Sequence, residues 1–134
     1  METIFEKALG VESPWRIEKT KFDVDKERLD IWIDFKRGWR FPLEEGGPAY
    51  PVHDTEEKTW RHLNFFQHEC YLHVRVPRVR TDAGGTITVL PPWAGRMLGF
   101  TLLFEALLLE LCRNMPVDRV ARLTNVSDNV SVHL

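Results

Sequence analysis

Apolar and polar residues alternate along two segments near the start of the chain, a pattern typical of half-buried β-strands. The first segment begins at Trp15, and the second runs through residues 29–35. In the second, Asp30, Trp32 and Asp34 separate apolar residues, which are Leu29, Ile31, Ile33 and Phe35. Residues 23–27 supply a polar turn, so the sequence predicts a β-hairpin over residues 14–36. A short amphipathic helix is predicted before it, at residues 2–9, ending at Gly10.

The middle of the chain predicts a loop followed by three further strands. Residues 36–58 contain several glycines and prolines, which favour loop structure. Strand patterns follow at residues 58–63, 69–80 and 86–90. Pro77 has no amide hydrogen to donate to a neighbouring strand, so we expect the far end of the second of these strands to lie at a sheet edge.

The last third of the chain predicts helices. Thr101 is a suitable N-cap for a helix that reaches about Arg113, and Asn114 suits the position just after it. Pro116 favours the first turn of a second helix, and Asn125 tolerates the left-handed backbone of a tight turn. A third helix is predicted from Asp128. Two short helices behind a longer supporting helix match the helix-turn-helix plan, so the fold class expected for the chain is α+β.

Composition limits the classes of protein that fit. The chain has 134 residues, of which 43% are hydrophobic and 28% charged, as in ordinary globular proteins. It contains no apolar run long enough to span a membrane. Two cysteines, Cys70 and Cys112, cannot form a disulfide framework, so we expect a cytoplasmic protein with buried, unpaired thiols.

Charge is distributed unevenly along the sequence. The net charge of −2 argues against binding to nucleic acid, but residues 1–58 hold 10 basic and 14 acidic residues, whereas residues 59–134 hold 8 and 6. Within residues 60–80 four arginines face a single acidic residue, Glu69; they are Arg61, Arg75, Arg78 and Arg80. Because phosphate attraction depends on local charge, this segment is a candidate DNA-binding face, with a solvated strand face as the alternative.

Several sequence blocks, in one order, resemble transposases of the ISL3 insertion-sequence family. They include residues 52–55, 58–63 and 71–80, then Pro92-Trp93-Ala94, residues 99–105 and 115–123. The similarity implies a zinc-ribbon-like module joined to a helix-turn-helix that recognises double-stranded DNA at transposon ends. It divides the chain into an amino-terminal helix and hairpin (1–38), a zinc-ribbon-like module (39–95) and a helix-turn-helix segment (96–134).

The sequence departs from the family where the metal ligands are expected. Family members carry two pairs of cysteine or histidine ligands, and here the corresponding positions are Phe41, Glu44, Thr81 and Gly84. Because these side chains cannot supply a tetrahedral zinc site, we expect no zinc and no other cofactor. Aromatic packing is expected to replace the metal, with Trp39, Phe41, Trp60 and Tyr71 as candidates. A residual site from His62, His68, Cys70 and His73 is a weaker alternative, because His73 would point to the other face of its strand.

The family's DDE-type catalytic domain follows the helix-turn-helix, and its three carboxylates have no counterparts in this sequence. We therefore expect a truncated, non-enzymatic chain whose DNA contacts come from the four arginines and from the turn and third helix. The contacts expected there are Asn125, Ser127, Asn129 and His133. The alternative is an oligomerisation module, or a decayed fragment that binds protein partners and no DNA. The leucine-rich segment 102–111 is then either the buried centre of the fold or a homodimer contact.

Overall fold

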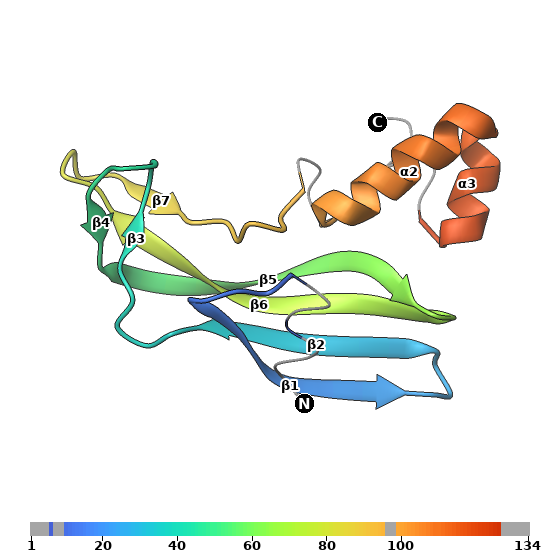
Figure 1. The fold of residues 1–134 in the computed structure, drawn as a ribbon, viewed down its shortest axis with the longest axis horizontal. Coiled ribbons are helices and arrows are strands. Elements are labelled where there is room, and N and C mark those ends of the chain that lie inside the picture. The colour runs from blue at the N-terminus through green and yellow to red at the C-terminus, as the bar shows by residue number, and fades with distance from the viewer. Residues whose placement is uncertain (1–5, 7–9, 96–98, 127–134) are drawn as a thin grey trace.

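Long strands with one apolar face account for most of the fold, which is shown by the computed structural model in Figure 1. The structure describes residues 6, 10–95 and 99–126. The β-rich part comes first, and two helices follow it, so the α+β class is confirmed. The elements are β1 (Trp15–Asp23), β2 (Arg28–Phe35), β3 (Phe41–Pro42), β4 (Ala49–Tyr50), β5 (Val52–Phe65), β6 (His68–Arg80), β7 (Thr86–Thr88), α2 (Leu102–Asn114) and α3 (Val117–Thr124).

The main sheet has the strand order β1-β2-β6-β5, with β7 pairing to the far end of β6. β1 and β2 form the predicted antiparallel hairpin, in which Trp15 lies opposite Phe35. β2 then pairs in parallel with β6, so that Ile31 lies opposite Leu72. The predicted boundary after residue 38 therefore separates two strands that are neighbours in one sheet.

One face of this sheet is apolar and the other is polar, as period-two alternation requires. Ile31 and Val74 are fully buried in the apolar face. After β7 the chain returns along this face, where Val89, Trp93 and Ala94 pack against the core. α2 is the next element along the chain (Figure 1).

The middle of the chain contains more strand than the sequence predicts. β5 begins at Val52 rather than Lys58, inside the segment expected to be a loop. The early half of β5 has few apolar residues, but its backbone pairs with β6 from Val52 onward. The remainder of the predicted loop contains only the short β3–β4 pair.

The edge predicted from Pro77 is wrong. The far end of β6 is flanked by β5, where Thr55 lies opposite Pro77, and by β7, which pairs from Arg78. On that second side β2 pairs only as far as Val74. Pro77 thus falls in the gap between two successive neighbours, where an amide hydrogen is not needed.

The two helices begin and end close to their predicted limits. The Thr101 hydroxyl accepts a hydrogen bond from the Phe104 amide at 3.3 Å, which confirms the N-cap. Asn114 is the last helical residue, and Met115 rather than Asn114 caps α2. Asn125 follows α3 with φ 58° and ψ 43°, the left-handed conformation expected of it. The helix predicted at residues 2–9, apart from Glu6, and the third helix predicted from Asp128 lie outside the described residues.

In the described ranges, no helix combines the length and apolar character needed to cross a membrane.

Candidate nucleic-acid interface

The helical hairpin α2–α3 has its own small apolar core. Phe104, Leu108 and Val120 are almost completely buried, and Phe100 closes one end of the cluster. Ala121 is 5% exposed, consistent with the small residue that a close helix contact requires. The Val126 amide donates to the Ala121 carbonyl at 3.0 Å, so the turn after α3 is fixed by backbone as well as packing. Three predicted DNA contacts, Ser127, Asn129 and His133, lie outside the described residues.

The turn at Asn125 is anchored to the β-sheet by side chains of β5 and β6. The Asn125 side-chain nitrogen Nδ2 donates to Glu69 Oε2 at 2.8 Å. The Asn125 carbonyl accepts from Arg61 Nη1 at 3.1 Å. The Tyr71 hydroxyl donates to the other oxygen of Glu69 at 2.7 Å. Sequence reasoning missed these anchors, because no local pattern reports a contact between residues 56 positions apart.

Electrostatics stabilise this anchor. Burial raises the pKa of the Glu69 carboxyl, but the hydrogen bonds from Tyr71 and Asn125 and the nearby arginines outweigh it, so the pKa is lowered overall. Glu69 is therefore ionised at neutral pH and able to accept both hydrogen bonds. The Glu69 carboxylate thus joins the turn after α3 to the sheet, in addition to apolar packing.

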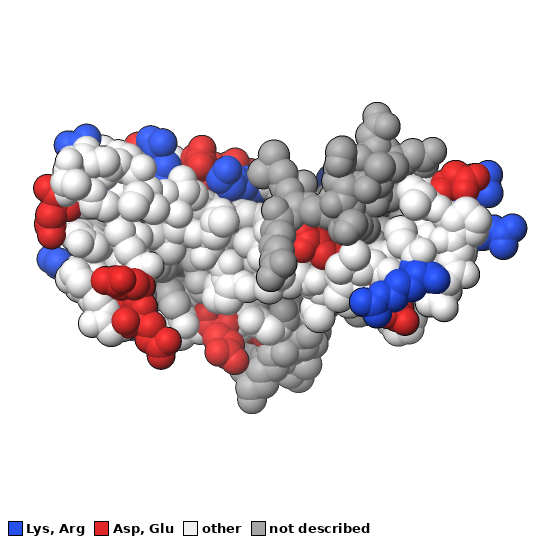
Figure 2. Space-filling model, turned by 90° about the horizontal axis from the view of Figure 1, so that it is seen from above, with Lys and Arg blue, Asp and Glu red and all other residues white. Residues whose placement is uncertain are grey.

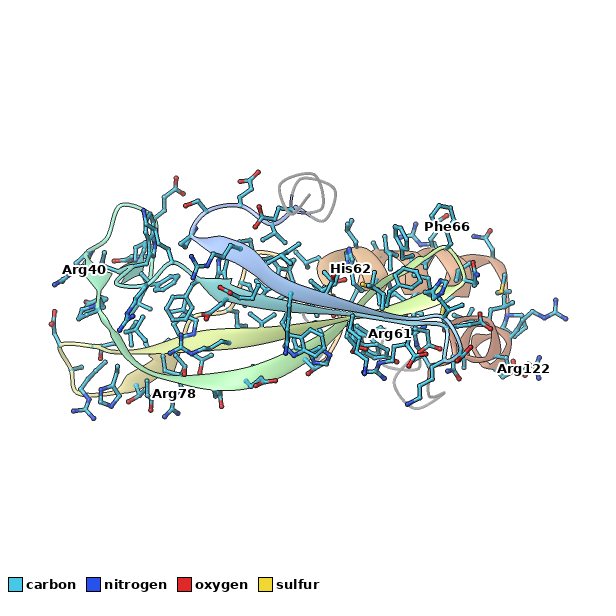
Figure 3. All side chains as sticks on the ribbon, turned by 90° about the horizontal axis from the view of Figure 1, so that it is seen from below. Arg40, Arg61, His62, Phe66, Arg78 and Arg122 are labelled. Carbon is cyan, nitrogen blue, oxygen red and sulfur yellow. The ribbon has the colours of Figure 1, made fainter. Side chains whose placement is uncertain are left out.

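Arg61 does not belong to an exposed arginine face. Only 6% of the residue is exposed, and its guanidinium lies 4.8 Å from the centre of the Phe104 ring. The backbone of Arg61 also pairs with Gly99 and Thr101, the residues that lead into α2. In Figure 3 Arg61 lies close to the helices, whereas Arg78 lies toward the opposite end of the molecule. Arg61 is engaged in the docking of the helical hairpin and does not share an exposed face with the other three arginines.

The other three arginines of this segment remain accessible but have acidic or imidazole neighbours. Arg75 lies 3.3 Å from Asp34, and its side chain is 55% exposed. Arg78 donates two hydrogen bonds to Asp54, one of them at 2.7 Å, and this pairing lowers the pKa of the Asp54 carboxyl. Arg80 lies 3.3 Å from the His53 ring. Part of their charge is therefore neutralised within the protein.

The polar face of the sheet carries a continuous set of side-chain contacts. His73 Nε2 lies 2.6 Å from Asp30, which also accepts hydrogen bonds from Arg28. Trp32 stacks on the His73 ring at 4.9 Å, and the Lys19 ammonium lies 4.5 Å from the Trp32 ring centre. Burial raises the pKa of the Asp30 carboxyl, but its bonds to Arg28 and His73 lower it by more. Trp32 is thus covered by neighbouring strand side chains.

The positions expected to hold zinc do not form a metal site. Phe41 is 4% exposed and packs on Trp15 and Phe35, with ring centres 5.8 and 5.4 Å away. Glu44 is exposed, and Gly84 has a φ of +90° in the turn before β7. Across the parts of the chain that the structure describes, no group of three or more histidine, cysteine or acidic residues could hold a metal ion. The residues present do not fit the family's zinc.

The side chains of the alternative metal site, His62, His68, Cys70 and His73, do not form a metal site either. His62 uses Nδ1 to bond the Thr101 hydroxyl at 2.8 Å, and burial lowers the pKa of its ring. Cys70 is buried in the apolar face, where burial raises the pKa of its thiol to about 12. His73 bonds Asp30 on the polar face. The four side chains therefore do not converge.

The supporting helix α2, the short helix α3 and the left-handed turn after it agree with the first part of the helix-turn-helix plan. Two family models match the chain in that order. Residues 46–80 match the zinc-finger of transposase IS204/IS1001/IS1096/IS1165, and residues 90–130 match the helix-turn-helix domain of transposase family ISL3. The two matches support the resemblance of the chain to the amino-terminal region of ISL3 transposases. No curated protein and no solved structure matches it.

Proposed function

We propose that the chain recognises transposon-end DNA and does so without carrying out strand cleavage or transfer itself. The observation that carries this proposal is the Asn125 turn, which bonds to Glu69 and Arg61 of the sheet. A recognition helix needs a rigid support to reach base edges in a fixed orientation, and this turn stands immediately before the segment expected to form that helix. Both domain matches concern the DNA-binding part of the family.

Within this proposal the DNA contacts have distinct roles. Asn129 and His133 contact base edges. Ser127 and Asn125, at the start of the recognition segment, contact the DNA backbone. Arg75, Arg78 and Arg80 contact phosphates, exchanging part of their pairing with acidic residues for DNA. Arg61 positions the helical hairpin. The segment 96–134 is the recognition unit, and residues 1–38 and 39–95 form the sheet that supports it.

Zinc and other cofactors have no part in the proposal, since aromatic packing at Phe41 occupies one of the ligand positions. DNA is the partner and the cytoplasm the site of action, because bacterial chromosomal DNA lies there. No membrane association is proposed.

The test is fluorescence anisotropy of the chain with a duplex from the parent element's inverted repeat and with a random duplex. We expect tighter binding to the repeat, and Asn129→Ala should reduce that preference about tenfold, as loss of one bidentate base contact does. Asn114→Ala is the matched control, because Asn114 lies at the end of α2 and bonds only the Glu110 carbonyl within the described residues. Equal affinity of the unaltered chain for both duplexes would contradict recognition of transposon ends.

A second candidate function is self-association through α2. Only Phe104, Glu105 and Leu108 of this helix are buried. Four of its leucines are between 38% and 57% exposed, namely Leu102, Leu103, Leu107 and Leu109. An exposed apolar helix face of this kind favours contact with a second copy of the chain. Dimerisation is compatible with DNA binding and would present two recognition units.

A further inference from the structure

An open groove of about 590 Å³ lies beside the β1–β2 end that is formed by Trp15 and Phe35. Its lining includes four arginines, Arg16, Arg37, Arg40 and Arg75, and the indole of Trp39. Asp34 is the sole carboxylate among the lining residues. Such a surplus of guanidinium groups in one groove attracts a polyanion.

Only part of this charge is neutralised by the protein. Arg75 lies 3.3 Å from Asp34, and Arg16 bonds Glu18 at 2.8 Å in a pair whose side chains are about half exposed. Exposed pairs of this kind are weak and exchange readily. Within the described part of the chain, Arg37 and Arg40 make no hydrogen bond or ion pair. Arg37 and Arg40 are exposed residues of the groove lining whose charge has no acidic partner among the described residues.

The loop that presents them is held in place by its own backbone. The Lys36 amide donates to the Pro14 carbonyl at 2.8 Å, and the Trp39 amide donates to the Lys36 carbonyl at 3.1 Å. Gly38 adopts a φ of +81°, a conformation that a side chain would strain. The Lys36 ammonium lies 5.9 Å from the centre of the Trp39 ring. Arg37 and Arg40 therefore extend from a turn that is already ordered.

The groove lies far from the helical hairpin. Figure 3 shows Arg40 at one end of the molecule and Arg122, on α3, at the other. On the side drawn in Figure 2, the described lysines and arginines are scattered toward the ends and form no continuous basic patch. The groove is thus a concentration of positive charge apart from the helices. Of its four arginines, only Arg75 lies within residues 52–80.

We propose that this arginine groove binds phosphate groups of the DNA backbone, as a second DNA contact at the end opposite the helix-turn-helix. Guanidinium groups hold phosphate oxygens through paired, charge-assisted hydrogen bonds, and the groove is open enough for a continuous backbone to pass along it. The inference rests on the proposed function in taking DNA as the polyanion. It adds Arg16, Arg37 and Arg40 to the phosphate contacts proposed above and shares Arg75 with them.

The test compares Arg37→Gln/Arg40→Gln with Lys21→Gln/Lys26→Gln, which removes the same charge from exposed positions of β1 and its turn. Binding to a random duplex is measured across a salt series. We expect the groove variant to lower the slope of log Kd against log salt by about two, since each lost phosphate contact changes it by about 0.9. We expect the control to change the slope by less than half a unit. Equal slopes for the two variants would overturn the proposal.

A local signal shows whether DNA enters the groove. Protein labelled with 5-fluorotryptophan gives a fluorine resonance for Trp39, assigned with Trp39→Phe. Adding the random duplex should shift this resonance in the unaltered chain and not in the Arg37→Gln/Arg40→Gln variant. A resonance that stays in place with DNA, or that shifts equally with polyglutamate, would overturn a phosphate site.

The outcomes separate the two proposals. If the groove variant leaves the salt slope unchanged while the chain still prefers the inverted repeat, the groove proposal is wrong and the proposed recognition of transposon ends is retained. If the preference is absent but the random duplex still shows the change in slope, the groove stands and end recognition fails.

Discussion

Arg61 and Arg78 show how surroundings assign different roles to one side-chain type. Arg61 is buried beside Phe104 and bonds a backbone carbonyl, whereas Arg78 pairs with Asp54 at the surface. The sequence places both in one basic segment and cannot distinguish them, since the burial of Arg61 depends on a helix that begins 41 residues later. The residue type correctly predicts a positive charge at both positions. Tertiary contacts decide whether that charge is accessible to a ligand.

Phe41 is expected to contribute strongly to the stability of the sheet module. It packs between Trp15 and Phe35 at a position expected to hold a metal ligand. We expect Phe41→Ala to lower the free energy of unfolding by about 3–5 kcal/mol, the usual cost of removing a buried phenylalanine. Urea denaturation of the unaltered chain and the variant measures this difference.

Leu43→Ala is the matched control, because Leu43 lies in the same hairpin and is 36% exposed. It should cost less than about 1 kcal/mol. The thermal midpoint of the unaltered chain should not change when EDTA is added. A fall of several degrees with EDTA would instead indicate a structural metal.

At the scale of elements, the sequence predicted those with a strong local pattern. The β1–β2 hairpin, β6 and α2 follow from alternation or from capping residues such as Thr101. The parallel pairing of β2 with β6 was not predicted, because it joins strands separated by a long crossover. The beginning of β5 was missed because its residues Val52–Lys58 are mostly polar and are held in a strand by pairing with β6.

The docking of the helical hairpin on the sheet gives a prediction at this scale. Arg61→Met keeps the apolar stem against Phe104 but removes the hydrogen bond to the Asn125 carbonyl. We expect amide exchange at Val120 and Ala121 to become at least tenfold faster, because losing a charged hydrogen bond costs about 1.5–3 kcal/mol. Hydrogen-exchange mass spectrometry over residues 116–126 measures this.

Arg78→Met is the comparison variant, since it removes an exposed guanidinium distant from the hairpin. Exchange in residues 116–126 should stay within twofold of the unaltered chain. If both variants accelerate exchange equally, or neither does, Arg61 does not hold the hairpin.

The whole molecule is elongated, and β6 spans much of its length (Figure 1). Thirteen residues of extended chain cover about 40 Å at about 3.3 Å per residue. One turn of B-DNA is about 34 Å. β6 alone is therefore somewhat longer than one turn of B-DNA. Glu69, which bonds the Asn125 turn, lies near one end of this strand, and Arg75 of the arginine groove lies near its middle.

Self-association is also a property of the whole molecule. We expect sedimentation equilibrium to detect a dimer of the unaltered chain, and Leu103→Gln/Leu109→Gln to shift it to the monomer by exposing polar groups in the α2 contact. Leu90→Gln is the control, because Leu90 is 54% exposed but lies outside the helices. If the unaltered chain stays monomeric over a 100-fold range of concentration, dimerisation through α2 is contradicted.

The aromatic cluster around Phe41 changes what such a module depends on in the cell. Thiolate ligands are open to oxidants and to competition for scarce metal, and a phenyl ring between Trp15 and Phe35 is open to neither. Apolar contacts instead weaken on cooling. A module that aromatic packing holds in place of a metal, as proposed for this chain, exchanges sensitivity to metal starvation and oxidative stress for sensitivity to cold.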